Sequence, residues 1–597
     1  MAEKLTNEQQ AAVDSRERSL LVSAAAGSGK TKVLVERLFS YVEREGANLD
    51  DFLIITYTRA AASELRGKIA KALTERMERD PGNYHLRQQM LRVYRADIKT
   101  VDAFCTALLR ENCHLLGEDA RGHALRPDFR VLDENEAQVL RERVLARTLD
   151  DFYDCLTTGS TLLADTLGAG RDDSALEDLV LELHAKLQAQ PYEDKWLEAQ
   201  RAFWRAVPDK IENTPYGKIL LNEVRRKARH CKNLLQRAAQ EMCANDALNQ
   251  KYAPAFLDAS YQLEALEGKT AEGWDAARGV TIAFPRLAAV KDSDGGEMKA
   301  RMKSLWDNCK ETVKGFAEIF SASSDEAVED LRTMAPAMLA LIDLTADFSR
   351  RYNEEKRRRN SADFSDQEHE AIRLLIGEDG APTELARIVS ARYREIMVDE
   401  YQDTNEVQNR IFDAISCKGE NLFTVGDVKQ SIYRFRLADP RIFLQHYNTW
   451  PPLEDAEEHD SAKLLLSRNF RSRKEVLDAT NFIFCNILSE EMGELDYGAD
   501  EMLRLGANYV ESSACGAEFH LLDLPTQTGE QRVRASEAEA AFVADYISDM
   551  LTSEFPIQDD KTKELRPVRE EDIVILMRSP STRLLDYRPA KRPAYRE

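Results

Sequence analysis

Short apolar runs alternate with helical patterns over the first 110 residues. The runs Leu20–Ser23 and Phe52–Tyr57 have the length of buried strands, and each precedes a stretch with helical periodicity. Strands that alternate with helices are typical of βαβ units on a parallel sheet. We therefore predict an α/β domain with a parallel sheet that begins within residues 1–110.

The pattern changes over residues 111–355, where long helical periodicities replace the strand-like runs. The clearest begins at Ser174, a suitable N-cap with Glu177 three residues later. Its apolar positions follow at helical spacing: Leu176, Leu179, Val180, Leu183 and Leu187. We predict a separate all-α domain here. The charged stretches Val224–Lys232 and Lys356–Arg359 are interpreted as solvated helix faces, with a nucleic-acid contact as the alternative.

The α/β pattern returns near residue 396. Strand candidates are Ile396–Val398, Leu422–Val425 and Leu464–Leu466. The acidic, proline-containing stretch Trp450–Asp460 is interpreted as a linker. We expect residues 356–450 to complete the first α/β domain and residues 451–597 to hold the linker and the incomplete start of a second.

Composition agrees with a large globular protein. At about 100–200 residues per domain, 597 residues suggest three to five structural units. The longest apolar runs, such as Ile573–Met577, have the length of strands and are far shorter than the roughly 18 residues that a membrane span needs. The N-terminus lacks an apolar signal region, and the nine cysteines include no Cys-x-x-Cys pair. We expect a cytoplasmic protein without a zinc or iron–sulfur site.

The overall charge is strongly negative. Asp and Glu number 105 against 82 Lys and Arg, a net charge of −23. An acidic total argues against nucleic acid as a partner. It is, however, a sum over the whole chain, and a narrow channel of hydroxyls, amides and aromatic rings can bind a strand without a basic total. The charge therefore leaves this partner open.

A phosphate-binding loop is predicted between the first strand and the following helix. It consists of Ala24, Ala25, Ala26, Gly27, Ser28, Gly29, Lys30 and Thr31. In such a loop, backbone N–H groups and the helix N-terminus converge on phosphates. Lys30 would neutralise the β- and γ-phosphates of ATP, and the Thr31 hydroxyl would bind Mg²⁺. Ala24 replaces the usual first glycine. The alternative is a simple turn of small residues.

An acidic pair supplies the partner that such a loop needs. Asp399 and Glu400 directly follow the apolar run Ile396–Val398. Asp399 can bind Mg²⁺ through water, and Glu400 can orient and deprotonate the attacking water. Acidic pairs also cap strands without any function. The phosphate-binding loop, together with the following Gln402 and Asp403, favours the catalytic interpretation.

Residues 399–404 (DEYQDT) and 425–436 (VGDVKQSIYRFR) resemble motifs II and III of superfamily 1A DNA helicases of the UvrD/Rep type. Further stretches resemble the Q motif, motifs Ia and Ib, an acidic motif and motif IV, in the family's order: 5–13, 56–62, 99–105, 362–366 and 467–472. Within the superfamily the chain is most similar to the AddA family of ATP-dependent helicase/nuclease subunits. The long insertion between motifs Ib and II is the main reason.

The resemblance implies a RecA-like motor domain in two parts, 1–110 and 356–450, with a large all-α insertion and the start of a second RecA-like domain. It also implies roles for residues at the nucleotide. Gln9 would read the adenine edge, although Thr6 and Gln9 also form a possible capping box. Phe470 would stack on the adenine. Gln430 would sense the γ-phosphate from the first motor domain, and Arg471 would reach it from the second. For Arg471 the alternative is an ordinary surface salt bridge.

On the DNA side, the resemblance places Tyr57, Thr58, Thr100 and Phe435 along a single-strand channel. Aromatic rings there stack on bases without sequence preference, and hydroxyls bind phosphates. A core position for Tyr57 or Phe435 is the alternative. Asp102 stands where relatives have histidine, and its carboxylate would repel a phosphate, so it is not counted as a ligand.

The implied activity is that of an ATP-driven, 3′→5′ DNA helicase and translocase. It would work in double-strand break repair and homologous recombination with an AddB-type partner subunit. Motifs V and VI and the family's nuclease domain are not visible, so we expect an N-terminal portion of a longer protein, with no nuclease residue to assign. Two alternatives stay open: a stand-alone UvrD/Rep-type helicase, and a chain that binds ATP and single-stranded DNA without coupled turnover.

Overall fold

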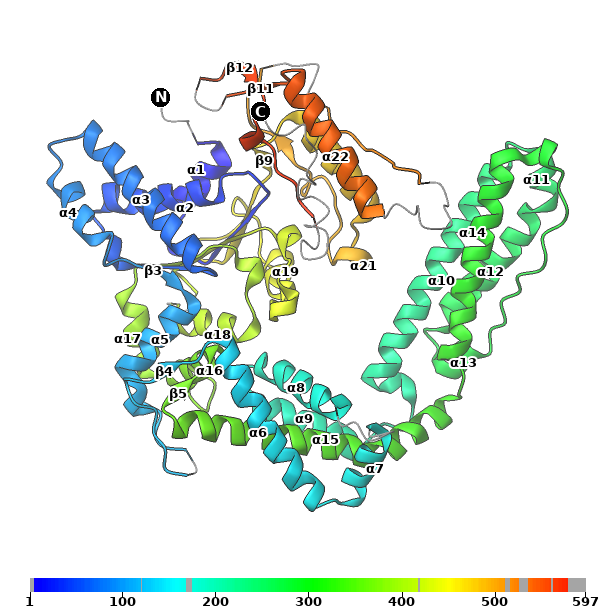
Figure 1. Ribbon diagram of the computed structural model, residues 1–597, viewed down its shortest axis with the longest axis horizontal. Helices are drawn as coiled ribbons and strands as arrows, with labels where there is room; N and C mark the ends of the chain where they lie inside the picture. The colour runs from blue at the N-terminus through cyan, green and yellow to red at the C-terminus, as the bar shows by residue number, and fades with distance from the viewer. Residues whose placement is uncertain are drawn as a thin grey trace. The chain divides into compact units, whose positions relative to one another are not determined.

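The computed structural model describes residues 5–119, 121–167, 174–416, 419–510, 516–524, 535–559 and 562–577. The chain divides into two compact units (Figure 1). One is built from two separate stretches, Met1–Leu116 and Asp366–Glu597, and the other is Gly117–Ser365. Among the described residues, no helix is both long enough and apolar enough to span a membrane.

A six-stranded parallel sheet forms the core of the first unit, in the order β3-β2-β6-β7-β1-β8. Its strands are β1 Leu20–Ala24, β2 Phe52–Thr56, β3 Asp97–Thr100, β6 Glu395–Val398, β7 Leu422–Gly426 and β8 Ala462–Leu466. The central strands β1, β2, β6 and β7 are buried at every position. Strands covered on both faces are apolar along most of their length, which is why these runs were recognisable in the sequence. The predicted α/β fold with a parallel sheet is confirmed.

The register brings the carboxyl ends of distant strands to one edge. Val22 of β1 is paired with Val425 of β7, and Val398 of β6 is paired with Thr424 of β7. The residues that follow these three strands therefore emerge side by side, as expected at the ligand-binding edge of an open parallel sheet.

β8 pairs along its whole length with β1 at the edge of this same sheet. Its residues fall within 451–597, which we expected to hold a linker and the start of a second domain. The sequence does not show this placement, because a parallel strand can follow its neighbour after any length of connection. The apolar run Ile573–Met577 has the length of a strand but forms none, and Val574 is 76% exposed.

Helices cover the sheet. They are α1 Asn7–Asp14, α2 Lys30–Glu45, α3 Arg59–Arg79, α4 Tyr84–Arg92, α5 Val101–Asn112, α16 Phe364–Leu375, α17 Glu384–Arg392, α18 Glu406–Ile415 and α19 Pro440–Thr449. Apolar side chains from α1, α2, α3 and α4 join those of β1, β2 and β7 in one hydrophobic cluster. After β8 the chain forms β9 Arg468–Asn469, α20 Lys474–Ile487, α21 Glu490–Gly493, β10 Arg504–Leu505, α22 Ala535–Thr552, β11 Pro556–Gln558 and β12 Leu565–Pro567. β9 and β10 are parallel, and β11 and β12 are antiparallel.

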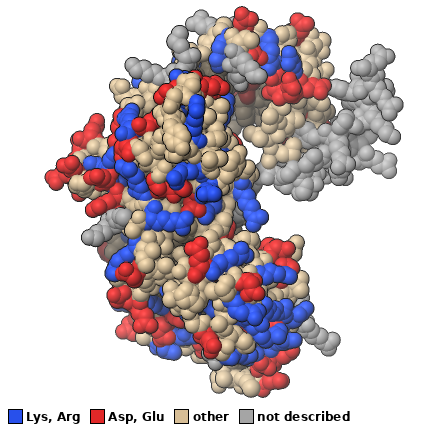
Figure 2. All heavy atoms as spheres, turned by 90° about the vertical axis from the view of Figure 1, so that its left-hand side faces the viewer, with Lys and Arg blue, Asp and Glu red and all other residues tan. Residues whose placement is uncertain are grey.

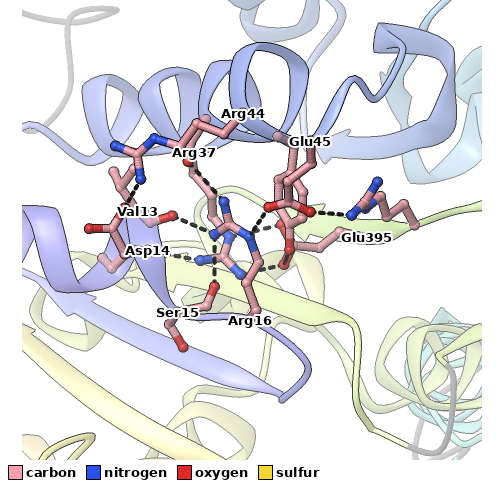
Figure 3. Close-up of polar contacts among 12 residues, drawn as sticks. Val13, Asp14, Ser15, Arg16, Arg37, Arg44, Glu45 and Glu395 are labelled. Atoms are coloured by element: carbon pink, nitrogen blue, oxygen red, sulfur yellow. Dashed lines mark hydrogen bonds and ion pairs between the residues drawn. The ribbon is translucent and has the colours of Figure 1, made fainter.

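A buried ion pair ties three of these elements together (Figure 3). Arg37 of α2 is completely buried, and its Nε donates to Glu395 Oε2 at the start of β6 over 2.8 Å. Its Nη1 donates to the carbonyl of Ala12 in α1 over 2.5 Å. Tyr41 donates to the same Glu395 carboxylate over 3.1 Å. The guanidinium therefore links the first helix, the helix after the loop, and the strand that carries the acidic pair.

The second unit is helical. Its helices are α6 Glu134–Asp154, α7 Thr158–Leu167, α8 Ser174–Gln188, α9 Glu193–Arg205, α10 Pro215–Met242, α11 Asp246–Lys251, α12 Ala253–Lys269, α13 Trp274–Arg278, α14 Asp292–Ile319 and α15 Ser324–Arg358. A short parallel pair, β4 Arg130–Val131 and β5 Ser361–Ala362, accompanies them. α10, α12 and α14 lie side by side (Figure 1) and share one apolar core. α6, α7, α8 and α15 share another. The helix predicted from this periodicity is present as α8, whose first helical residue is Ser174, the residue expected as its N-cap.

The two charged stretches predicted to be solvated differ in their exposure. The charged side chains of Val224–Lys232 are partly or fully exposed on α10, whereas Lys356 is buried. On α10, Arg229 and Lys232 pair with Glu267 of α12 across the helix surface. Lys356, predicted to lie on a solvated face, is 1% exposed and its Nζ lies 2.9 Å from Asp363 Oδ2. The charged stretch alone could not show this, because the compensating carboxylate lies beyond it, between β5 and α16.

Candidate functional site

The predicted phosphate-binding loop lies between β1 and α2, so that its last residues open the helix. Gly27 and Gly29 have φ values of +69° and +85°, a region that favours glycine. A Cβ on Gly27 would come within 2.7 Å of Asn469 Nδ2. Gly27 is therefore needed both for its backbone conformation and for the close approach of a second segment.

Two of the loop's N–H groups are already used to hold its shape. Ala25 N–H donates to Leu466 O of β8 over 2.9 Å, and Ser28 N–H donates to Ala25 O over 3.1 Å. The Ser28 hydroxyl is buried and has no hydrogen-bond partner among the described residues. A phosphate oxygen is a chemically suitable partner for such a hydroxyl.

The acidic pair lies beside this loop. Lys30 Nζ is 2.7 Å from Glu400 Oε2, and Asp399 N–H donates to Ile55 O over 3.0 Å. Burial and the neighbouring charge of Glu400 together raise the pKa of Asp399 to about 6, although Lys30 opposes both. The structure thus brings together three residues that the sequence predicted for the site: a lysine and two carboxylates.

The acidic pair is connected to the segment after β7 through Gln402, which lies in the 3₁₀ turn η4 Tyr401–Asp403. Gln402 Nε2 donates to Glu400 Oε2 over 2.9 Å, and its Oε1 accepts from Asp427 N–H over 2.9 Å. Gln430, in the turn η5 Val428–Gln430, donates to Asp427 Oδ2 over 2.8 Å. The predicted γ-phosphate sensor is therefore joined to Glu400 by a short hydrogen-bonded chain. The bridging role of Gln402 was not predicted.

Residues 469–471 approach the loop from the other side. Asn469 Nδ2 donates to Ala26 O over 2.7 Å, and Phe470 N–H donates to Gly27 O over 2.9 Å. The Cβ of Arg471 lies 2.9 Å from the position of a Cβ added to Gly27. Arg471 therefore stands beside the predicted phosphate site. Asn469 was missed as a functional residue, although it lies in the motif that predicted its neighbours.

A small pocket opens between α1 and the residues after β8. It is lined by Thr6, Glu8, Gln9, Ser28, Leu466, Ser467, Arg468 and Phe470. The capping box of α1 is present: Gln9 Oε1 accepts from Thr6 N–H over 3.0 Å, and Thr6 Oγ1 accepts from Gln9 N–H over 3.2 Å. Gln9 Nε2 also donates to Ser28 O over 2.9 Å. The pocket therefore joins the two residues expected at the adenine to the phosphate-binding loop.

The donors predicted for Mg²⁺ are chemically suitable. Thr31 offers a hydroxyl and Asp399 a carboxylate, and Mg²⁺ binds such hard oxygen ligands. Asp403 adds a carboxylate oxygen, Oδ1, that is buried without a hydrogen-bond partner among the described residues. Burial and the charge of Glu400 together raise the pKa of Asp403 to about 6. A cation at this position would favour the ionised forms of these acids.

The residues expected along the DNA differ in their surroundings. Tyr57 is half-buried and its hydroxyl lies 2.5 Å from Thr404 Oγ1. Thr58 is exposed and caps α3, whereas Thr100 is buried and caps α5. Phe435, in the turn η6 Arg434–Arg436, is 76% exposed, which contradicts a core position. Burial raises the pKa of Asp102.

The negative net charge is not spread as a uniform acidic surface. On the face drawn in Figure 2, Lys and Arg are interspersed with Asp and Glu. Positively charged side chains are therefore present on this face although the net charge of the whole chain is −23.

A parallel sheet with a phosphate-binding loop after β1 and an acidic pair after β6 defines a RecA-like P-loop motor domain. The family is more specific. Residues 5–451 match the model of the UvrD/REP helicase N-terminal domain, and the chain belongs to the UvrD/REP helicase family.

Curated relatives share similarity along almost the whole chain. They are the A-subunits of ATP-dependent helicase/nucleases from several bacteria. The protein from Ruminiclostridium cellulolyticum is 34% identical over 96% of this chain and 49% of its own length. Those from Alkaliphilus oremlandii and Listeria innocua are 35% and 33% identical, each over 96% of this chain and 47% of theirs. The chain thus spans about half the length of these relatives.

Proposed function

We propose that this chain is the ATP-hydrolysing motor of a DNA helicase and translocase. The observation that carries the proposal is that three separate segments of the chain are linked to the phosphate-binding loop. Lys30 contacts Glu400, Gln430 is joined to that acid through Asp427 and Gln402, and Arg471 stands beside Gly27. These are the charges and amides that phosphoryl transfer needs around a nucleoside triphosphate.

In this mechanism the loop and Lys30 hold the phosphates, and Thr31 with Asp399 would hold Mg²⁺. When bound, the metal would supply positive charge that offsets the charge of the phosphates. Glu400 takes the proton of the attacking water. Gln430 and Arg471 bind the γ-phosphate. Gln9 and Phe470 hold the adenine.

Single-stranded DNA is bound by four further residues: Tyr57, Thr58, Thr100 and Phe435. Movement of the segment that carries Arg471 would couple hydrolysis to translocation.

We further propose that the chain works within a two-subunit helicase–nuclease that repairs double-strand breaks. The names of its relatives combine a helicase with a nuclease and describe each protein as a subunit. An AddB-type second subunit would be its partner. Co-purification of such a partner with the tagged chain would support this assembly, and a stand-alone helicase would purify without it.

The test of the motor is Lys30→Ala. Because Lys30 supplies the only lysine charge predicted at the phosphates, ATP hydrolysis stimulated by single-stranded DNA should fall at least about 100-fold. Lys71→Ala, an exposed lysine on α3, should keep wild-type turnover. Turnover by Lys30→Ala at the wild-type rate would contradict the site. A wild-type chain that binds nucleotide and single-stranded DNA without hydrolysis would instead support the binding-only alternative.

A further inference from the structure

A buried ion pair lies next to the proposed nucleotide site, outside the set of residues given roles above. Lys429 Nζ in η5 is 2.5 Å from Glu501 Oε2. The side chains of Lys429 and Glu501 are 13% and 5% exposed. Tyr447 of α19 donates to the other oxygen of the same carboxylate over 2.6 Å. Glu501 lies in none of the motifs that the sequence revealed.

One end of this pair reaches the proposed γ-phosphate sensor. Asp427 Oδ1 lies 2.9 Å from Lys429 Nζ, and Asp427 Oδ2 accepts from Gln430 Nε2 over 2.8 Å. Lys429 and Gln430 therefore share one carboxylate, which is itself 1% exposed. Although burial alone would lower it, the pKa of Lys429 is raised overall by Asp427 and Glu501, so the ammonium stays charged.

The other end reaches the segment that carries Arg471. Glu501 lies just before β10, and β10 is held against the residues around β9 by two backbone hydrogen bonds. Arg504 N–H donates to Ser467 O over 2.9 Å, and Gly506 N–H donates to Asn469 O over 2.8 Å. The chain continues from β9 directly into Arg471. A shift of Glu501 would therefore be passed through β10 and β9 to this arginine.

We propose that the Lys429–Glu501 pair is a positioning device that keeps Gln430 and Arg471 in register for ATP hydrolysis. This inference rests on the proposed function and adds two residues to it. Neither side chain needs to touch the nucleotide, since Lys429 acts through Asp427 and Glu501 acts through β10. Exposed ion pairs contribute little, but removing one partner of a buried pair leaves an uncompensated charge, so both neighbours must shift.

The kinetic test uses near-isosteric changes. Glu501→Gln keeps an acceptor for Tyr447 but removes the charge. We expect kcat for DNA-stimulated ATP hydrolysis to fall about tenfold while KM for ATP stays within about twofold, because alignment is lost rather than binding. Lys429→Met should have the same effect, and the double variant should be no slower than the slower single variant. Unchanged kcat in both single variants, or a rise in KM alone, would overturn the proposal.

The matched control is Glu494→Gln. It breaks the pair between Glu494 and Arg434, which connects the same two stretches of chain but lies at the surface, with the side chain of Arg434 59% exposed. This variant should keep the wild-type kcat and KM. A loss equal to that of Glu501→Gln would mean that any ion pair between these stretches suffices, and would overturn the specific role of Lys429.

Hydrogen exchange provides a readout that does not depend on turnover. In Glu501→Gln, the amides of Arg504 and Gly506 should exchange about tenfold faster than in the wild type, because β10 loses its anchor. They should be unchanged in Glu494→Gln. Wild-type exchange in Glu501→Gln would overturn the proposal whatever the kinetics show. If the wild type does not hydrolyse ATP, the proposed function fails, and the exchange rates still decide whether the pair positions β10.

Discussion

Glu400 combines an unusual backbone with two polar contacts. It has a φ of +53°, and its carboxylate accepts hydrogen bonds from both Lys30 and Gln402. Left-handed backbone at a residue other than glycine is uncommon and is often found where a side chain must be aimed at a reacting group. The conformation directs the carboxylate toward the phosphate-binding loop rather than along the strand.

We predict that Glu400→Gln separates nucleotide binding from hydrolysis. Removing the base should lower kcat at least about 100-fold. Binding of ATP should be equal or tighter, because Lys30 loses a carboxylate partner that competes with the phosphates. Steady-state hydrolysis and titration with a fluorescent nucleotide would measure the two effects. Glu406→Gln, a change on α18 next to Arg410, should alter neither; loss of binding in Glu400→Gln would contradict its role as the base.

At the scale of elements, the Arg37–Glu395 pair joins α1, α2 and β6 inside the core (Figure 3). We predict that Arg37→Met lowers the free energy of unfolding of the first unit by about 3–5 kcal/mol, since it leaves Glu395 charged and buried. Urea unfolding would measure the loss. Arg44→Met breaks an exposed pair with Asp14 and should cost less than about 1 kcal/mol.

The double variant Arg37→Met/Glu395→Leu distinguishes buried charge from lost packing. Replacing both charges with apolar side chains should recover most of the stability lost in the single variant. A double variant as unstable as Arg37→Met would show that Arg37 acts through packing and through its bond to Ala12 instead.

The contact between α16 and α18 predicts a dependence of stability on pH. Glu368 of α16 is buried and accepts from Gln408 of α18 over 2.7 Å. Burial, with a contribution from the charge of Asp102, raises the pKa of Glu368 to about 7. Between pH 4.5 and pH 7 the unfolded chain releases this proton while the folded chain keeps it. The wild type therefore loses stability as the pH rises through this window, by about 3 kcal/mol from this group.

Glu368→Gln cannot ionise and should escape this loss. Urea unfolding at several pH values should show the variant gaining on the wild type from pH 4.5 to pH 7, with a constant difference above that. Curves that stay parallel through the window would contradict a raised pKa for Glu368.

At the scale of the whole molecule, the two compact units have separate hydrophobic cores. We predict two calorimetric unfolding transitions, one for each unit. ADP at 100 times its Kd should raise the free energy of unfolding of the first unit by about 2.7 kcal/mol and leave that of the second unchanged.

Tryptophan fluorescence follows the second unit. Four of the five tryptophans lie in this helical unit: Trp196, Trp204, Trp274 and Trp306. The transition followed by tryptophan fluorescence should therefore be nearly unaffected by ADP. A single transition shifted in both readouts would contradict this independence.

Much of the fold was encoded locally and could be predicted. The central strands are buried at every position and mostly apolar because both faces of the sheet are covered, so Leu20–Ser23 and Leu422–Val425 were recognisable as runs. The capping box of Thr6 and Gln9 spans four residues, and the phosphate-binding loop spans eight. Such features depend on neighbours in sequence, which a single chain displays directly.

Only the tertiary structure decided which distant residues meet. The placement of β8 beside β1, the contact of Asn469 with Ala26, and the bridge that Gln402 forms to Asp427 all depend on strand order and register. Lys356 and Lys429 show the same limit at the level of charge, since the side chain of Lys356 is buried beside Asp363 and that of Lys429 is 13% exposed beside the distant Glu501. The sequence by itself determined the chemistry that is available. Folding decided which charges pair, because long-range packing sets these contacts and leaves no periodic signal along the chain.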